Sequence, residues 1–282
     1  MYILFDIGGT KMRIALSRDG VSFDTPVIVS TPKDFEEGMT VFEKTVAGLI
    51  AHNAEAIKAV AGGVPGPFDR NDGVLLAAPH LTKWVGRPLT ARIGEICKAP
   101  AYVENDSALV GLGEAVAGAG RGFDIVAYLT VSTGVGGARI IRGRIDDSAH
   151  GFEPGHQIID PDNSLCPECE GNDLESYVSG SAVAKRFGRQ PKDIDVAHLW
   201  NDELPRFLAY GINNIIMHWS PDCIVLGGSM IVGNPAISLA RMEAYLKELG
   251  GIFPELPAIK KAELGDVGGL YGALAYAKQK GV

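Results

Sequence analysis

The stretch "YILFDIGGTKMRIALSRDG", residues 2–20, has the clearest strand pattern near the start of the chain. It reads as an apolar strand, a Gly-Gly turn, a second strand with alternating apolar residues, and a reverse turn at "RDG". Isoleucine, leucine, phenylalanine and tyrosine in such runs are typical of strands. The sequence therefore predicts a β-hairpin near the start of the chain.

A second stretch repeats this design. "DIVAYLTVSTGVGGARIIRGR", residues 124–144, has the same order of apolar strand, glycine-rich turn, alternating strand and glycine-containing turn. We interpret the two hairpins as an internal duplication, which predicts two related lobes. Helices alternate with the strands elsewhere, for example in "ELPRFLAYGINNIIMHWS", residues 203–220, so the predicted class is α/β.

The composition is that of an ordinary globular protein. The 282 residues are 46% hydrophobic and 21% charged, with a net charge of −8 and basic residues scattered singly. This pattern disfavours nucleic acid and anionic membranes as partners, and no apolar run reaches the roughly 18 residues of a membrane span. Four cysteines are too few for a secreted disulfide scaffold, so we expect a cytoplasmic protein with reduced cysteines.

Both glycine turns carry groups that could bind phosphate. Thr10 and Lys11 adjoin the first turn, and Thr133 adjoins the second. Glycine permits positive φ and lets a phosphate approach backbone N–H groups closely. The alternative is that the glycines only reverse the chain, as in most hairpins. Neither turn matches the P-loop pattern or opens a helix directly, which disfavours an ordinary P-loop or dinucleotide fold.

A pair of polar residues stands between a strand and a helix. In "ENDSALVGLGE", Asn105 and Asp106 precede an apolar run of helical character. One interpretation is a helix N-cap, which needs no function. The other is an aspartate at a helix N-terminus, kept ionised by the dipole and able to accept a hydroxyl proton.

Three further polar residues occur in loops later in the chain. Glu153 and His156 lie three apart between glycines, and Glu175 begins the predicted helix "LESYVSGSAVAKRF". Each alone is explained as a surface polar group or a first-turn acid. Together with Asn105 and Asp106 they would give a dense hydrogen-bonding set for a polyhydroxylated ligand.

These motifs resemble the ROK family of sugar kinases, within the actin/hexokinase superfamily. The resemblance runs from "FDIGGTKMRIAL" to the C-terminal "GDVGGLYGALAYA" and includes "GVPGPFD", "ENDSALVGLGE", "VSTGVGGARI", "GFEPGH" and "DCIVLGGSM". It implies a two-lobed, actin-like ATPase fold of duplicated ribonuclease H-like type. We expect a small lobe of residues 1–106 with 266–282 and a larger lobe of residues 107–265, with the C-terminal helix returning to the first lobe.

The resemblance also implies roles for individual residues. Asp106 would be the general base, Asp6 would orient water bound to Mg²⁺, and the other positions would bind ligands. The sugar would contact Asn105, Asp106, Glu153, His156 and Glu175. The phosphates and adenosine of ATP would contact Gly8, Gly9, Thr10, Lys11, Thr133, Gly134, Gly227 and Gly228.

The implied activity is phosphorylation of a hexose by ATP, with glucose at its 6-hydroxyl as the first expectation. The family also contains kinases for fructose, mannose, N-acetylmannosamine, allose and β-glucosides, and His80 stands where the family often has asparagine. Polyphosphate is an alternative phosphoryl donor.

The alternative function is that of a catalytically inactive sugar sensor. Regulators of this family, however, carry a DNA-binding segment before the first motif, which here begins near residue 4. A homodimer is expected from the resemblance.

The segment "SLCPECEGNDLE", residues 164–175, raises the question of a metal. Zinc-bearing ROK proteins place a histidine, here His156, ahead of a cluster CxCGxxGCxE. Only Cys166 aligns with that cluster, and Asp173 stands where its last cysteine would be. Because Cys166 and Cys169 form a CxxC pair, we predict a structural zinc bound by His156, Cys166, Cys169 and Asp173. The alternatives are a redox pair and a metal-free polar loop.

Overall fold

The computed structural model describes residues 1–51 and 55–281, which form two compact units. The first unit comprises Met1–Ala117, Gly143–Gly151 and Asp266–Val282, and the second comprises Gly118–Arg142 and Phe152–Gly265. Each contains one main sheet and its own hydrophobic core.

The two main sheets have the same strand order, β3-β2-β1-β4-β7 and β10-β9-β8-β11-β12. The central strand of each sheet, β1 or β8, forms an antiparallel hairpin with the next strand in sequence, β2 or β9. On its other side it pairs with a parallel strand, β4 or β11. The predicted duplication is therefore confirmed. The strands are β1 (Tyr2–Ile7), β2 (Lys11–Ser17), β3 (Val27–Ser30), β4 (Ala59–Val64), β7 (Ala101–Asn105), β8 (Ile125–Val131), β9 (Val135–Ile141), β10 (Arg144–Ile145), β11 (Cys223–Gly227) and β12 (Ala258–Lys261).

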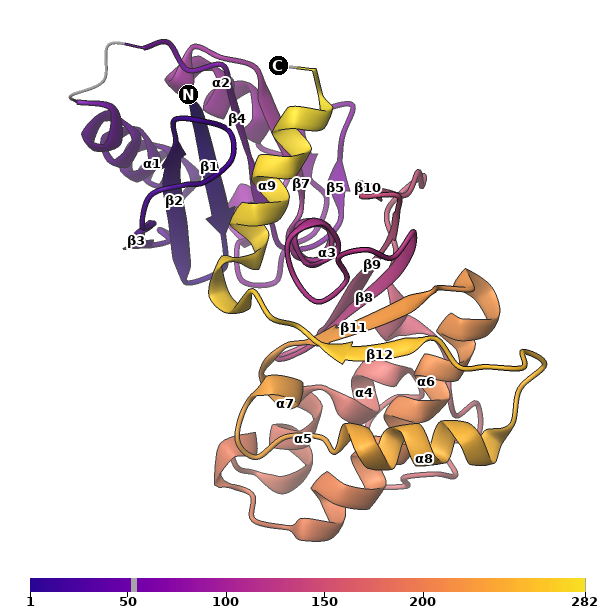
Figure 1. Ribbon diagram of the computed structural model, residues 1–282. Helices are drawn as coiled ribbons and strands as arrows, with labels where there is room; N and C mark the ends of the chain where they lie inside the picture. Colours follow the sequence, from indigo (N-terminus) through magenta and orange to yellow (C-terminus); the bar gives the residue numbers. More distant parts are fainter. Residues whose placement is uncertain (52–54, 282) are drawn as a thin grey trace. The chain divides into compact units, whose positions relative to one another are not determined.

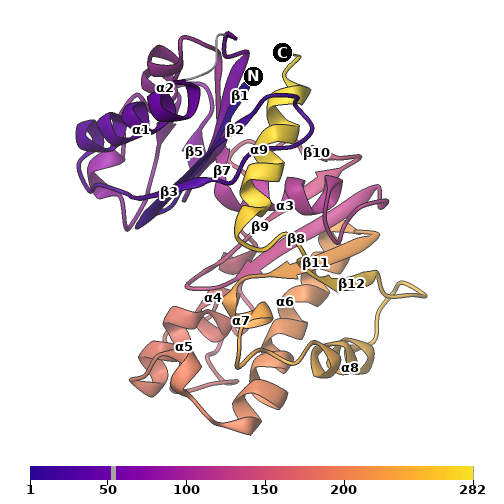
Figure 2. The same cartoon turned by 60° about the vertical axis from the view of Figure 1, so that its left-hand side comes forward.

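Helices cover both faces of the first sheet (Figures 1 and 2). α1 (Phe35–Ile50) and α2 (Leu89–Cys97) lie on one face, while α3 (Asp106–Val116) and α9 (Gly268–Gln279) lie on the other. A short hairpin of β5 (Phe68–Asp69) and β6 (Val74–Leu75) completes this unit. Because α9 packs on β1 and β4, the predicted return of the C-terminal helix to the first unit is confirmed.

The predicted boundary after residue 106 differs from the boundary of the compact units. α3 and α9 pack so closely that a Cβ on Gly272 would lie 1.8 Å from the carbonyl oxygen of Leu109. Glycine is required at such a contact because any side chain would clash with backbone. This contact keeps residues 106–117 in the first unit, which also includes Gly143–Gly151.

In the second unit, α4 (Leu174–Val178), α6 (Leu204–Trp219) and α8 (Leu239–Leu249) lie on one side of the sheet, with α8 packed on α6 (Figures 1 and 2). α5 (Gly180–Phe187) and α7 (Ser229–Val232) are shorter. The core joins strand residues such as Leu129 and Leu226 to Leu174, Tyr177 and Phe207 of the helices. Buried apolar area of this kind is the main stabilising contribution in such a unit. Among the described residues, no helix is both long and apolar enough to cross a membrane.

Candidate functional site

The first candidate group lies at the β1–β2 hairpin. Asp6 occupies β1 opposite Arg13 of β2, and one oxygen of Asp6 lies 3.3 Å from the Arg13 guanidinium. Burial raises the pKa of Asp6, and the neighbouring Arg13 charge only partly opposes this shift. Asp6 is thus a partly buried carboxylate, where an additional cation would stabilise its charge.

The first glycine turn differs in detail from the prediction. The N–H of Gly8 donates to the carbonyl of Lys11 at 2.8 Å, so this N–H is used within the turn. Neither Gly8 nor Gly9 adopts a left-handed φ. Glycine is instead needed at position 9 for space, because a Cβ there would lie 2.5 Å from the Cβ of His80. Thr10 and Lys11 are exposed.

Two residues that the sequence did not single out support this turn. The Thr31 hydroxyl donates to the carbonyl of Gly8 at 2.8 Å. The Lys33 ammonium donates to the carbonyls of Gly9 and His80 at 2.9 and 3.0 Å. Lys33 thereby links the turn to the loop that carries His80, a contact across 47 residues of sequence that no local pattern indicates.

Asn105 and Asp106 lie at the junction of β7 and α3. Asn105 is the N-cap of α3: its side-chain oxygen accepts from the Ala108 N–H at 3.1 Å, and its amide donates to the Gly66 carbonyl at 3.1 Å. Asp106 is the first residue of the helix, and its carboxylate accepts from the Ser107 N–H at 2.6 Å. The capping interpretation is therefore correct for Asn105, and the helix N-terminus favours an ionised Asp106.

An ion pair between a partly exposed arginine and a buried carboxylate fixes this junction, and no local sequence pattern indicates it. Glu104 is only 2% exposed, and its carboxylate accepts from Arg70 Nε at 2.7 Å and Nη2 at 3.1 Å. The same carboxylate accepts from the Asn105 N–H at 2.8 Å. Such a bidentate pair of a guanidinium and a carboxylate is strongly directional. The position of Glu104 directly before Asn105 was the available signal, whereas Arg70 lies 34 residues away.

The second candidate group lies in the second unit, around the β8–β9 turn. Thr133 and Gly134 form this turn, and a Cβ on Gly134 would lie 2.7 Å from a carboxylate oxygen of Glu175. That oxygen accepts from the Val135 N–H at 2.7 Å. Glu175 also lines a cavity of about 380 Å³, together with Ser176 and Ser179.

Glu153 and His156 frame a single 3₁₀ turn, Pro154–His156, that packs against β9. Burial raises the pKa of Glu153, with the nearby imidazole of His156 opposing the shift. His156 Nδ1 lies 2.9 Å from a carboxylate oxygen of Asp173, and this hydrogen bond raises the pKa of His156. Partial burial raises the pKa of Asp173, but hydrogen bonds from Ser176 and His156 outweigh this effect and hold that pKa below its ordinary value.

The glycines after β8 have a close counterpart after β11. Gly227 ends β11, and Gly228 has a φ of +86° with its Cβ position 2.3 Å from the carbonyl oxygen of Val131. Only glycine is free of strain in that conformation. The Gly227–Gly228 turn therefore lies against the end of β8 in the same unit.

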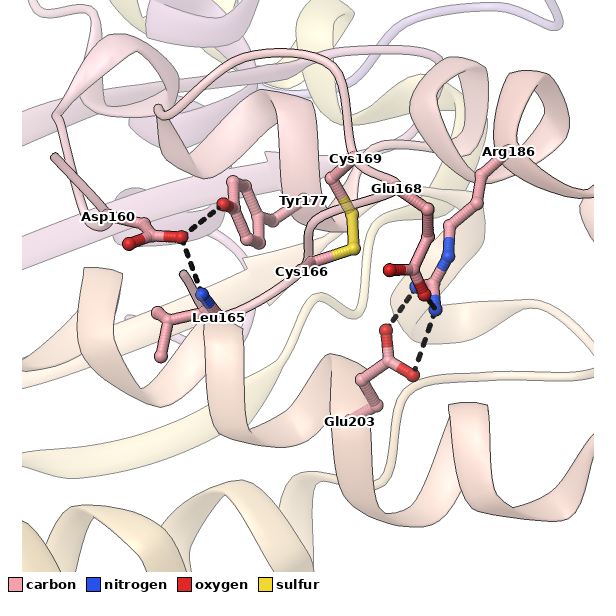
Figure 3. Close-up of a disulfide and its surroundings, with 8 residues drawn as sticks. All are labelled: Asp160, Leu165, Cys166, Glu168, Cys169, Tyr177, Arg186 and Glu203. Carbon is pink, nitrogen blue, oxygen red and sulfur yellow. Dashed lines mark hydrogen bonds and ion pairs between the residues drawn. A yellow bond between two sulfur atoms is a disulfide. The ribbon is translucent and has the colours of Figure 1, made fainter. Parts of the chain in front are cut away.

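The structure contradicts the predicted zinc site. Cys166 and Cys169 are joined in a disulfide, so neither sulfur is available as a thiolate ligand (Figure 3). Their predicted partners His156 and Asp173 bind each other directly. Within residues 1–51 and 55–281, no group of three or more metal-ligating side chains is assembled. The expectation of reduced cysteines holds only for Cys97 and Cys223, which are free and buried.

The predicted residues thus form two sets, one on each unit. Asp6, the turn of residues 8–11, Asn105 and Asp106 lie in the first unit. Thr133, Gly134, Glu153, His156, Glu175, Gly227 and Gly228 lie in the second. Each set combines a glycine turn with carboxylates, which is suited to binding phosphate and hydroxyl groups.

Comparison with known proteins gives a family match over residues 2–280, to the model described as "ROK family". The chain belongs to the ROK family. Glucokinase of Thermotoga maritima is 26% identical over 260 residues, covering 80% of each chain. An N-acetyl-D-glucosamine kinase of Escherichia coli is 28% identical over 302 residues, covering 97% of this chain and 98% of the relative.

Among solved structures, a ROK family glucokinase from Streptomyces griseus in complex with glucose and AMPPNP matches with a TM-score of 0.76. It is 26% identical, and the match covers 99% of both chains. The predicted actin-like α/β fold is confirmed by this similarity. The relatives are named for kinases of different sugars, so this ROK protein is assigned to the sugar kinases without a specific sugar.

Proposed function

We propose that this ROK protein transfers the γ-phosphoryl group of ATP to a hexose hydroxyl, with the 6-hydroxyl of glucose as the first candidate. The observation that carries this proposal is Asp106, an aspartate at the first position of α3 whose neighbours Asn105 and Glu104 are themselves fixed. A base held in a fixed direction at a helix N-terminus fits the needs of a kinase that acts on an alcohol.

Asp106 accepts the proton of the sugar hydroxyl as its oxygen attacks the γ-phosphorus. Phosphoryl transfer depends mainly on positioning and charge neutralisation, so an ordinary carboxylate is basic enough. The sugar ligands Asn105, Glu153, His156 and Glu175 hold the remaining hydroxyls and so decide which oxygen is in line. The support for Glu175 is the cavity that it lines, and the support for Glu153 and His156 is their position at one 3₁₀ turn that packs against β9.

Asp6 fits a role in holding Mg²⁺ with its bound water. Magnesium prefers carboxylate and water oxygens, and Asp6 is a partly buried carboxylate whose pKa is raised by burial. When bound with ATP, Mg²⁺ would neutralise charge on the phosphates. The peptide groups of the β1–β2 and β8–β9 turns would contact those phosphates, with Gly227 and Gly228 toward the nucleoside.

The choice of glucose rests on relatives named glucokinase, one of which was solved with glucose and AMPPNP. Relatives named for other sugars keep the alternative hexoses, among them N-acetylglucosamine, in the set to be tested. The homodimer is proposed from the resemblance alone, and the cytoplasmic location from the small number of cysteines.

A coupled assay of ADP release over a panel of sugars tests the proposal. The panel contains glucose, mannose, fructose, allose, N-acetylglucosamine and N-acetylmannosamine, each with ATP and, separately, with polyphosphate as donor and hexose phosphate as readout. We expect ATP-dependent turnover that needs a hexose, with the highest kcat/KM for glucose. Absence of hexose-dependent turnover with every sugar and both donors would favour the inactive sensor instead.

A further inference from the structure

The loop between Glu153 and Glu175 is closed on itself by backbone contacts. Ile158 and Asp173 form an isolated antiparallel bridge. The Leu174 N–H donates to the Gln157 carbonyl at 3.0 Å, and the Ile159 N–H donates to the Asn172 carbonyl at 3.0 Å. These bonds bring the start and the end of the loop together, so that residues near 156 and near 173 have fixed relative positions.

Asp173 makes contacts in two directions from this point. One carboxylate oxygen caps α4 by accepting from the N–H of Ser176 at 2.9 Å and from the Ser176 hydroxyl. The other oxygen holds Nδ1 of His156 at 2.9 Å. The Asp173 side chain is 20% exposed, whereas His156 is 59% exposed, so the imidazole is anchored at one nitrogen and open at its far side.

A second carboxylate, Asp160, holds the far part of the loop. It is 3% exposed and accepts from the Tyr177 hydroxyl at 2.5 Å and from the Leu165 N–H at 2.8 Å (Figure 3). Cys166 follows directly and is 2% exposed within the core of the unit. Its disulfide to Cys169 closes the next turn (Figure 3).

An additional ion pair network borders this turn. Glu168, between the two cysteines, lies 2.6 Å from Arg186 of α5, which also pairs with Glu203 (Figure 3). Each segment of the loop is therefore tied to the unit by a protein group. The four groups predicted to bind zinc all have other covalent or hydrogen-bonded partners.

We propose that Asp173 is a positioning residue for His156 in a sugar-binding loop that is organised without a metal. A carboxylate at Nδ1 fixes the plane of the imidazole and the tautomer, which leaves Nε2 toward the ligand. The direct pair of His156 and Asp173 takes the place of two bonds to a shared metal ion. This inference rests on the proposed function, since it assigns the sugar to the open side of His156.

The test separates capping of α4 from orientation of His156. Serine is as good an N-cap as aspartate, so Asp173→Ser keeps the cap of α4 but loses the contact with His156. Asp173→Asn keeps the cap and a neutral acceptor for the imidazole. We expect the KM for sugar to rise about tenfold in Asp173→Ser and less in Asp173→Asn, with the KM for ATP unchanged. The matched control is Asp162→Asn, an exposed residue of the same loop.

The His156→Ala variant distinguishes a failure of the proposed sugar contact of His156 from a failure of the positioning role of Asp173. We expect His156→Ala to raise the sugar KM, and Asp173→Ser to add nothing further in the double variant. If His156→Ala leaves the sugar KM unchanged, the proposed sugar contact of His156 is wrong. If His156→Ala has an effect but a folded Asp173→Ser, checked by circular dichroism, keeps the wild-type sugar KM, then Asp173 only caps the helix.

Metal analysis tests the claim that the loop is organised without a metal. We expect far less than one zinc per chain in protein purified without added metal, and unchanged turnover in 1,10-phenanthroline with excess Mg²⁺. About one zinc per chain, or loss of turnover that added zinc restores, would overturn it.

Discussion

The β7–α3 junction and the loop of residues 153–175 reach fixed side-chain directions by different means. At the junction, regular elements meet: Asn105 ends a strand and caps the helix that Asp106 begins. In the loop there is only one 3₁₀ turn and one isolated bridge, and Asp160, Asp173 and a disulfide hold the chain. The first kind of site therefore follows a local sequence pattern, whereas the second depends on which side chains bond to one another in the folded chain.

The largest expected effect is at the junction. Asp106→Asn should reduce kcat at least about 100-fold with saturating hexose and ATP, because asparagine cannot accept the hydroxyl proton. Asparagine keeps the size of the side chain and tolerates the helix start, so the thermal midpoint should be nearly unchanged. The exposed Asp72→Asn in the same unit serves as the control. Wild-type turnover in a folded Asp106→Asn would mean that this aspartate only begins the helix.

Loss of the ion pair between Arg70 and Glu104, beside the β7–α3 junction, should give the largest effect on stability. Arg70→Met leaves the Glu104 carboxylate, whose side chain is 3% exposed, without its charged partner. We expect the free energy of unfolding in urea to fall by about 3 kcal/mol. Arg92→Met, which removes a surface pair with Glu95, should cost at most about 1 kcal/mol. Equal losses in the two variants would show that burial of Glu104 does not matter.

Reduction of the loop disulfide should have a smaller effect. Cys166 and Cys169 are three positions apart, so the cross-link removes little chain entropy from the unfolded state. Reduction by a phosphine should lower the free energy of unfolding by at most about 2 kcal/mol. A larger loss would mean that the disulfide, rather than the two aspartates, organises the loop.

Alkylation at pH 8 verifies the state of the cysteines in the same samples. Burial raises the pKa of Cys97 to about 12 and that of Cys223 to about 11, so both remain unreactive thiols in the folded protein. We expect negligible label before reduction and label at Cys169, then Cys166, after it. Rapid labelling at these two cysteines without reductant would contradict the disulfide.

The sequence was sufficient where a feature repeats or follows local geometry. Two hairpins of one design predicted two sheets, and both have the same strand order. "END" before an apolar run indicated a strand end and a helix start, and in the structure Asn105 ends β7 and caps α3, which Asp106 begins.

The sequence was insufficient where contacts are distant or residues depart from a pattern. The partners Arg70 and Glu104 are 34 positions apart in the sequence, and Lys33 and His80 are 47 positions apart.

The zinc prediction was wrong because the residue types suit zinc, but the predicted ligands bind one another instead. Asp173 is a helix N-cap bonded to His156, and the CxxC sulfurs bind each other. The glycines at 8 and 9 were correctly located in a turn, but space rather than positive φ explains Gly9.

The most direct test of the proposed kinase activity is to follow the γ-phosphoryl group by phosphorus NMR. The wild-type protein is incubated with ATP, Mg²⁺ and glucose, and ADP, inorganic phosphate and sugar phosphate are measured together. We expect one glucose 6-phosphate for each ADP, with little ADP formed when the sugar is omitted. ADP accompanied by an equal amount of inorganic phosphate, whether or not glucose is present, would contradict it.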